Sequence, residues 1–318
     1  MGFLPLRNMI VKVWTILLIS AYLTARTSSC LAEEKIVIPP SPIDNAEHQV
    51  ISSDNHGVLL DKRLVVYYGN FYSPAMGILG EYPAPELWKK LKTESQEWEK
   101  ADPSKSVITG LEYIATVASS SPGKDKLYRN RMSNAQIQKA LSMVRMVDGA
   151  VLILDIQPGL SDLMNEITRL EPFLTQPDVH LAIDPEFIGT DKTPPSQKIG
   201  SISYKKINNV IDYLSQLVVK HQLPSKILVV HRFTKKMVTG FDKVKSDPNV
   251  QVVLNMDGWG TPTIKFATYR KVISSENNLL YPGIKLFYKN DVKYPPYRLL
   301  SKEEILGLQP QPIYIQYQ

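Results

Sequence analysis

Two carboxylates follow a buried run at one point in the sequence. The segment HLAIDPEF, residues 180–187, starts apolar and ends with Asp184 and Glu186 on either side of a proline. Because side chains alternate along a strand, both carboxylates are expected to point to the same face. Like charges that close raise at least one pKa, which keeps a carboxylic acid protonated for general acid work near neutral pH. An Asp after a strand also caps helices or closes turns, and this local role is the alternative.

Polar side chains end several other apolar runs. Tyr68 ends the first run, Asp155 and Gln157 end the third, His231 ends the fifth and Asp257 the sixth. We expect the catalytic carboxylates among Glu186, Asp184, Asp155 and Asp257. We expect the substrate-binding residues among Tyr68, Gln157, His231, Trp259, Lys285 and Tyr288, where Tyr68, Trp259 and Tyr288 would stack against sugar rings. His231 could instead be a ligand or a packed core histidine, and Trp259 could simply cover the core.

These residues need a framework that brings strand ends together. Apolar runs alternate with amphipathic stretches after Arg63, which is typical of βα units with a parallel sheet. The expected strands are residues 63–70, 107–118, 150–157, 179–186, 226–233, 250–257, 283–290 and 312–317. Eight strands with helical crossovers predict a single-domain α/β protein with a (β/α)8 TIM barrel, whose chemistry lies at the C-terminal strand ends. A doubly wound open sheet is the alternative, but the GxGxxG turn that often opens one is missing.

Residue Glu112 lies in the middle of the second expected strand. It is either a deep partner for a basic group or a sign that this strand is misplaced. No short metal-ligand spacing, GxSxG elbow or P-loop is present, so we expect no metal and no cofactor.

The N-terminal region differs from the rest of the chain. Arg7 and Lys12 precede an apolar stretch at residues 13–25, and no acidic residue occurs before Glu33. We predict a signal peptide or lipoprotein signal over 1–32, a flexible tether over 33–61 and the barrel over 62–318. The single cysteine, Cys30, is either the lipidated residue of a lipoprotein or is lost when cleavage follows Ala32. Both readings predict a secreted or extracytoplasmic protein, which is lipid-anchored in the first.

The net charge limits the kinds of partner. The formal charge of the whole chain is +6, but three of its 37 basic side chains lie in the leader, against 31 acidic residues that all follow it. The remainder is close to neutral and has no basic block interleaved with aromatics, so we expect no nucleic-acid partner. A membrane would be contacted only through the leader or a lipid on Cys30, and we expect a monomer.

Several segments resemble a family of uncharacterised secreted or lipid-anchored bacterial proteins, seen especially in actinobacteria. They are YYGNFYSPAMGILGEYP, LDIQPGLSDL, LAIDPEF, ILVVHRFT, NMDGWGTP and IKLFYKND. Phe187 stands where this family has Trp, and Arg232 where it has Gln. The resemblance implies export and brings no established activity.

A wider resemblance is to chitinase-like glycoside hydrolase barrels, whose fourth strand ends in D-x-x-D-x-D-x-E. Glu186 and Asp184 match the last two acidic positions, whereas Ala182 and Val179 stand at the two earlier ones.

We therefore hypothesise a surface-tethered glycoside hydrolase-like protein acting on a cell-envelope or environmental glycan. Glu186 would be the general acid, Asp184 would orient it, and Asp155 or Asp257 would be the second carboxylate. The alternatives are a non-catalytic glycan-binding or envelope scaffold protein on the same barrel, and a metal-dependent phosphodiester hydrolase.

Overall fold

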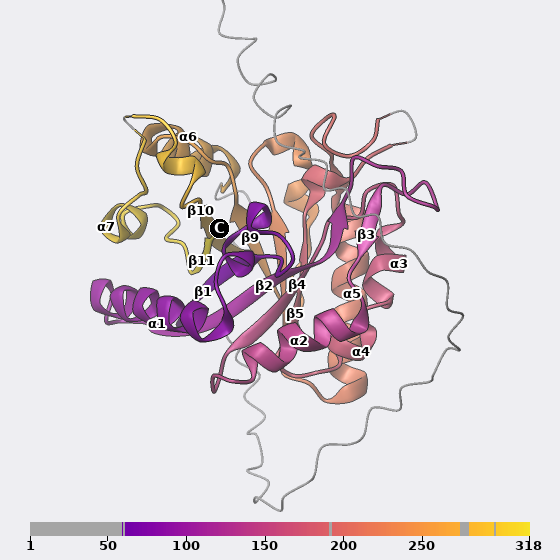
Figure 1. Ribbon diagram of the computed structural model, residues 1–318, viewed down its shortest axis with the longest axis horizontal. Coiled ribbons are helices and arrows are strands. Elements are labelled where there is room, and N and C mark those ends of the chain that lie inside the picture. The colour runs from indigo at the N-terminus through magenta and orange to yellow at the C-terminus, as the bar shows by residue number, and fades with distance from the viewer. Residues whose placement is uncertain (1–58, 60, 191–192, 274–279, 296) are drawn as a thin grey trace, which may run out of the picture. The chain divides into compact units, whose positions relative to one another are not determined.

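The computed structural model describes residues 59, 61–190, 193–273, 280–295 and 297–318 (Figure 1). The predicted signal over 1–32 and Cys30 lie outside the described residues, as does nearly all of the predicted tether. Within the described ranges, no helix has the length and apolar character that crossing a membrane requires.

Eight parallel strands close into a barrel. They are β1 (Lys62–Gly69), β2 (Ser106–Ala118), β4 (Val151–Ile156), β5 (Val179–Ile183), β7 (Lys226–His231), β9 (Val250–Met256), β10 (Tyr281–Leu286) and β11 (Tyr314–Tyr317). Each pairs with the next, and β11 pairs with β1, which in turn pairs with β2. This closed order confirms the predicted (β/α)8 TIM barrel and excludes the open sheet. The short strand β3 (Arg129–Arg131) pairs antiparallel with β2 beyond the barrel.

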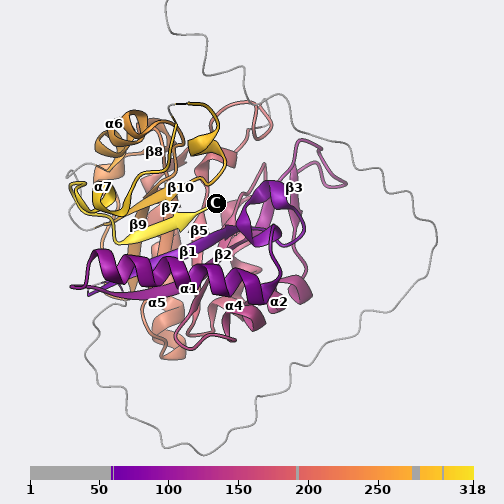
Figure 2. The same ribbon diagram turned by 60° about the vertical axis from the view of Figure 1, so that its left-hand side comes forward.

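Helices cover the outside of the barrel (Figures 1 and 2). They are α1 (Ala84–Ala101), α2 (Asn134–Val144), α3 (Leu163–Thr168), α4 (Glu171–Leu174), α5 (Tyr204–His221), α6 (Pro262–Val272) and α7 (Lys302–Leu306). Helix α5 shows why such segments are helical: Ser203 caps its first turn, and a buried stripe from Ile207 to Val218 faces the strands. A separate pair of two-residue strands, β6 (Ile202–Ser203) and β8 (Val238–Thr239), lies among the loops.

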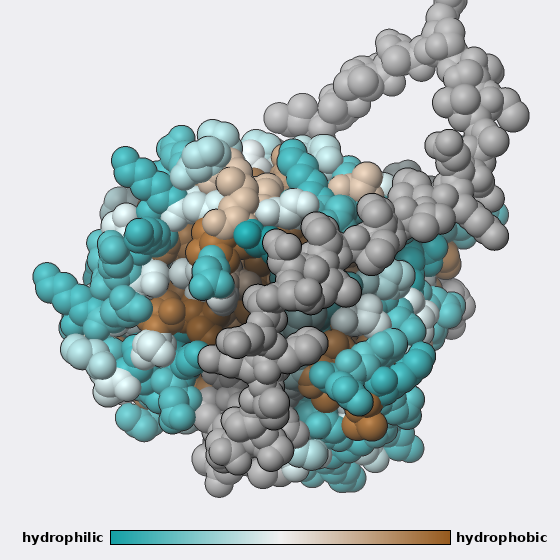
Figure 3. Space-filling model, turned by 90° about the horizontal axis from the view of Figure 1, so that it is seen from below, coloured by the Kyte–Doolittle hydropathy of each residue, from teal (hydrophilic) through white to brown (hydrophobic). Residues whose placement is uncertain are grey.

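The inside of the barrel has two chemically different halves. The half nearer the N-terminal ends of the strands is an apolar cluster that includes Leu64, Ile153, Val229 and Val253. Leu59, near the end of the predicted tether, belongs to this cluster, and its backbone N–H donates to Gln251 at 3.2 Å. Viewed from below, the molecule shows hydrophobic residues gathered in a hollowed part of this face (Figure 3). Towards the C-terminal strand ends, which we call the barrel mouth, the interior side chains become polar.

Two of the expected strands end three or four residues earlier than predicted. Strand β5 ends at Ile183 instead of 186, because Asp184 caps a 3-10 turn, Pro185–Phe187, by accepting the N–H of Glu186. Strand β10 ends at Leu286 instead of 290. The side-chain alternation invoked for Asp184 and Glu186 therefore does not extend to Glu186.

Candidate functional site

A directed chain of hydrogen bonds fixes Asp155 at the end of β4. The N–H of Ala118 donates to Gln157 Oε1 at 3.0 Å, and Gln157 Nε2 donates to the Tyr68 hydroxyl at 3.2 Å. Since the amide nitrogen occupies the hydroxyl oxygen as an acceptor, the hydroxyl itself donates to Asp155 Oδ2, at 3.0 Å. Tyr68, Gln157 and Asp155 thus act as one unit in which Asp155 is the final acceptor.

The other oxygen of Asp155 has no hydrogen-bond partner among the described residues. Asp155 is fully buried, and its Oδ1 accepts no hydrogen bond from the described residues. Burial, joined by the negative charge of Glu112, raises the pKa of Asp155 to about 6 against the opposing effect of His231. Because Oδ2 already accepts from Tyr68, a proton that binds Asp155 would reside on Oδ1.

A second unit ties β2, β7 and β9 together through His231. Its Nε2 lies 2.8 Å from Glu112 Oε1, and its Nδ1 lies 3.2 Å from Asp257 Oδ2. The other carboxylate oxygen of Glu112 accepts from Tyr314 and Gln316 of β11, and Gln316 in turn accepts from Asn255 at 3.0 Å. Glu112 is therefore the deep partner of a basic group, and the second strand was correctly placed.

The geometry makes His231 an imidazolium. Burial alone would lower the pKa of His231, but the carboxylates of Glu112 and Asp257 outweigh it and raise this pKa well above its ordinary value. With both ring nitrogens donating, His231 is a fixed positive charge at the centre of the barrel, and its nitrogens are engaged as in a satisfied core histidine.

The two carboxylates that drew attention in the sequence differ in exposure. Asp184 is 3% exposed, whereas Glu186 is half-buried. Burial and the charge of Asp257 raise the pKa of Glu186 to about 7, although Lys285 and His231 oppose them. Burial also raises the pKa of Asp184 well above its ordinary value, with Asp257, Glu186 and Asp155 acting in the same direction. Glu186 is thus a partly accessible acid whose pKa is raised to about 7.

Lys285 and Trp259 lie at the same end of the barrel. The ammonium of Lys285, on β10, lies 3.6 Å from the centre of the Tyr68 ring. Its positive charge lowers the pKa values of Asp155 and Glu186. Trp259 is half-buried on the loop that begins with Asp257 and leads to α6.

Tyr288 is not brought to this group. Its ring stacks on Tyr317 with centroids 5.2 Å apart, and its hydroxyl donates to Glu94 of α1 at 3.2 Å. It therefore packs between the barrel and α1, and the expectation that it lines a sugar site is not supported by its position. The backbone N–H of Tyr288 still donates to the carbonyl of Gln318 at 2.9 Å, so the extended pairing continues past the end of β10. Residues 285 and 288 are three apart, so alternation places Tyr288 outside when Lys285 is inside the barrel.

Three side chains come close enough to share a cation. Donor atoms of Glu112, Asp155 and His231 all lie within 4.8 Å of one another. In this arrangement, however, His231 and Glu112 are hydrogen-bonded to each other, so a metal would have to displace the proton between them. The geometry describes a buried ion pair rather than a preformed set of ligands.

Asn255, Tyr314 and Gln316 were not expected at the mouth, and Glu112 was singled out without being placed among the candidate site residues. Each lies within a strand rather than at its end. The available signal was period-two alternation, since Asn255 precedes Asp257 by two residues and Tyr314 precedes Gln316 by two.

Another buried carboxylate lies outside the barrel mouth, on α3. Glu166 accepts from Arg129 Nε at 2.9 Å and from two nitrogens of Arg131, each at 2.8 Å. Arg169 Nε lies 4.0 Å from Glu166 Oε2, and the Ser161 hydroxyl donates a hydrogen bond to Glu166 Oε1. Burial raises the pKa of Glu166, but Arg131, Ser161 and Arg129 outweigh it and hold this pKa at about 2. This carboxylate is fully compensated and structural.

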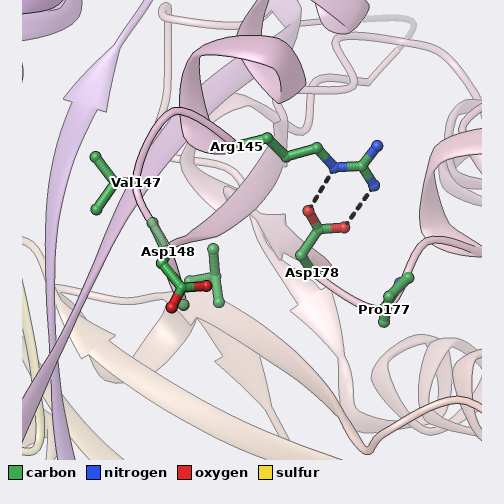
Figure 4. A pocket seen from close by; sticks show the side chains of 8 residues that line it. Arg145, Val147, Asp148, Pro177 and Asp178 are labelled. Carbon is green, nitrogen blue, oxygen red and sulfur yellow. Dashed lines mark hydrogen bonds and ion pairs between the residues drawn. The ribbon is translucent and has the colours of Figure 1, made fainter. Parts of the chain in front are cut away.

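A hollow of about 340 Å³ lies away from these carboxylates, beside the first residues of β4 and β5. Arg145 and Asp178 flank it and form a two-point ion pair, with Nε–Oδ2 and Nη2–Oδ1 distances of 2.8 and 2.9 Å (Figure 4). Arg145 and Asp178 therefore satisfy each other's charge, and Asp148 also lines the hollow.

Comparisons with known proteins assign neither a family nor an activity to this chain. No model of a known protein family matches the chain, and no curated protein matches it in sequence. One similar solved structure is a glycoside hydrolase family 5 enzyme from Prevotella bryantii B14, with 9% identity and a TM-score of 0.35 over 70% of this chain and 77% of that one. At that level the similarity says nothing about activity, so the fold assignment rests on the closed strand order.

Proposed function

We propose that this protein is a glycoside hydrolase that acts by carboxylate general acid catalysis at the barrel mouth. The observation that carries the proposal is Glu186: it is half-buried, follows a barrel strand directly and has its pKa raised to about 7. An acid with a pKa close to the working pH is suited to protonating the oxygen of a leaving sugar.

The neighbouring side chains have distinct proposed roles. Asp184 accepts the backbone N–H of Glu186 at 3.0 Å and so holds the turn that presents the acid. Asp257 or Asp155 supplies the second carboxylate that glycoside hydrolysis requires. The hydrogen bonds of Tyr68 and Gln157 fix the orientation of the Asp155 carboxylate. His231 fixes Asp257 through a hydrogen bond to Oδ2.

The proposed setting is outside the cytoplasm. The leader-like composition of residues 1–32 supports export, and Cys30 offers a point for lipid attachment. The proposed substrate is therefore a glycan of the cell envelope or the surroundings.

The test is mass spectrometry of products after the purified protein is incubated with peptidoglycan fragments, chitin, chitosan and glucan oligomers. We expect Glu186→Gln to reduce cleavage about 10²- to 10⁴-fold, because it removes the transferable proton and keeps the shape. Glu303→Gln, on the exposed face of α7, is the matched control and should cleave like the unmodified chain.

Two outcomes would contradict the proposal. If the protein binds a glycan but cleaves none, the barrel is a binding or scaffold protein. The hydrogen bond between Glu112 and His231 is compatible with that function as well. If cleavage is lost on chelation, or falls on phosphodiesters instead, a bound metal carries the reaction.

A further inference from the structure

Among the described residues, the fully buried side-chain atoms at the barrel mouth that have no hydrogen-bond partner are all acceptors. Among the described residues there, they are Asp155 Oδ1, Asp257 Oδ1 and Asn255 Oδ1. Asp155 and Asn255 are fully buried and Asp257 is 8% exposed. Buried acceptors without donors are costly, so a ligand that fits this site must bring several hydrogen-bond donors.

Negative charge at the mouth exceeds the positive charge that faces it. The carboxylates are Glu112, Asp155, Asp184, Glu186 and Asp257, whereas the facing cations are His231 and Lys285. Tyr68 and Tyr314 also face the group, and burial raises both of their pKa values, so they stay neutral. Lys265 of α6 lies behind Asp257, but it is paired with Asp291 at 2.9 Å. The five carboxylates therefore outnumber the two cations that face them.

Of the two cations, one is already committed. His231 gives both of its N–H groups to Glu112 and Asp257. Lys285 lies over the Tyr68 ring, 3.6 Å from its centre. Protons therefore have to make up the difference near neutral pH, which is why the pKa values of Asp155, Asp184 and Glu186 are all raised.

We infer that the barrel mouth recognises an ammonium group, so that the glycan of the proposed reaction is an amino sugar with free amines. An ammonium has three donors and one positive charge, which match the partnerless acceptors and the excess of carboxylates. An N-acetylated or plain sugar would supply donors but no charge. This inference rests on the proposed function for the identity of the substrate, but the binding preference can be measured without turnover.

Isothermal titration calorimetry tests the preference with single sugars that contain no bond to cleave: glucosamine, N-acetylglucosamine and glucose. At pH 6.5 we expect glucosamine to bind at least tenfold more tightly than either neutral sugar. Its binding should weaken at pH 5, because Asp155, Asp184 and Glu186, whose pKa values are raised, then hold more protons. Titrations in two buffers of different ionisation enthalpy should show protons released when glucosamine binds at pH 6.5.

Matched variants locate the effect. Asp155→Asn and Asp257→Asn keep the side-chain shape and remove one charge each, so either should reduce the glucosamine preference about tenfold if the variant unfolds as cooperatively as the parent. Glu303→Gln should leave the preference unchanged.

Equal affinity for the three sugars, or a preference for a neutral one, would overturn the inference even if hydrolysis of a neutral glycan were observed. Binding of magnesium or calcium chloride with the same proton release, and no glucosamine binding, would also overturn it and assign the charge excess to a metal. Glucosamine binding without hydrolysis of any amino glycan would support the inference while the proposed catalysis fails.

Discussion

Glu166 on α3 and Glu186 at the barrel mouth are the same side chain in opposite surroundings. Glu166 has three arginines within 4.0 Å, and its pKa is held at about 2. Glu186 shares its surroundings with Asp257 and other carboxylates, and its pKa is raised to about 7. Glu166, which stabilises the fold, is paired with positive charges. Glu186 has too few positive charges beside it, so its ionised form destabilises the folded state. The contrast therefore points to the mouth as the place where a ligand acts.

The largest effect on stability should follow from breaking the compensated group. Glu166→Gln leaves Arg131 and Arg169 without their carboxylate and Arg129 with only Asp125, so we expect a loss of about 3–5 kcal/mol in the free energy of unfolding. Urea denaturation near pH 7 measures this loss. Glu304→Gln, which removes a surface pair with Arg298, should cost at most about 1 kcal/mol. A similar small cost for Glu166→Gln would show that the cluster is not structural.

The two groups should also respond to pH with opposite sign. The folded-state pKa of Glu166 is depressed, so its stabilisation is present above about pH 4.5 and is lost as the pH falls towards 2. The pKa of Glu186 is raised, so folding loses stability as the pH rises from about 4.5 through 7.

Glu186→Gln isolates the second half of this contrast. It should be equal in stability to the parent at pH 4 and about 1–3 kcal/mol more stable at pH 8, because the variant has no charge to bury. Thermal and urea unfolding across this range measure the difference. A difference that does not change with pH would mean that Glu186 titrates normally.

A smaller effect should follow from removing the hydroxyl of Tyr68. Its hydrogen bond lowers the pKa of Asp155, so Tyr68→Phe should raise this pKa above about 6 and cost about 1 kcal/mol of stability. Tyr288→Phe is the matched control, since its hydroxyl bonds to Glu94 outside the barrel and should leave Asp155 unchanged. If Asp155 has the same pKa in the two variants, the Tyr68 hydroxyl does not influence Asp155 and the proposed unit is wrong.

The barrel was predictable because its strands are buried on both faces and read as continuous apolar runs. All eight were found, and the errors of several residues at the ends of β5 and β10 came from carrying the strands too far, past Pro185 in one case. The strand-end residues Asp155, His231 and Asp257 meet at the mouth because parallel strands end at the same side.

Other parts of the site depend on the register between strands, which a single sequence does not specify. Glu112 pairs in register with Tyr68 of β1, and its contacts with Tyr314 and His231 cross the barrel interior. Tyr288 was misplaced because its strand parity relative to Lys285 was overlooked. The compensated Glu166 was not noticed, since two of its three arginines, Arg129 and Arg131, come from β3, a strand absent from the predicted set.

The most direct measurement is a carbon-13 NMR titration of the side-chain carboxyl groups, with Glu186→Gln, Asp155→Asn and Glu166→Gln used for assignment. We predict apparent pKa values of about 7 for Glu186, about 6 for Asp155 and about 2 for Glu166. Values near the ordinary 4 for both Glu186 and Asp155 would contradict the account, because the barrel mouth would then have no uncompensated acid to offer a substrate.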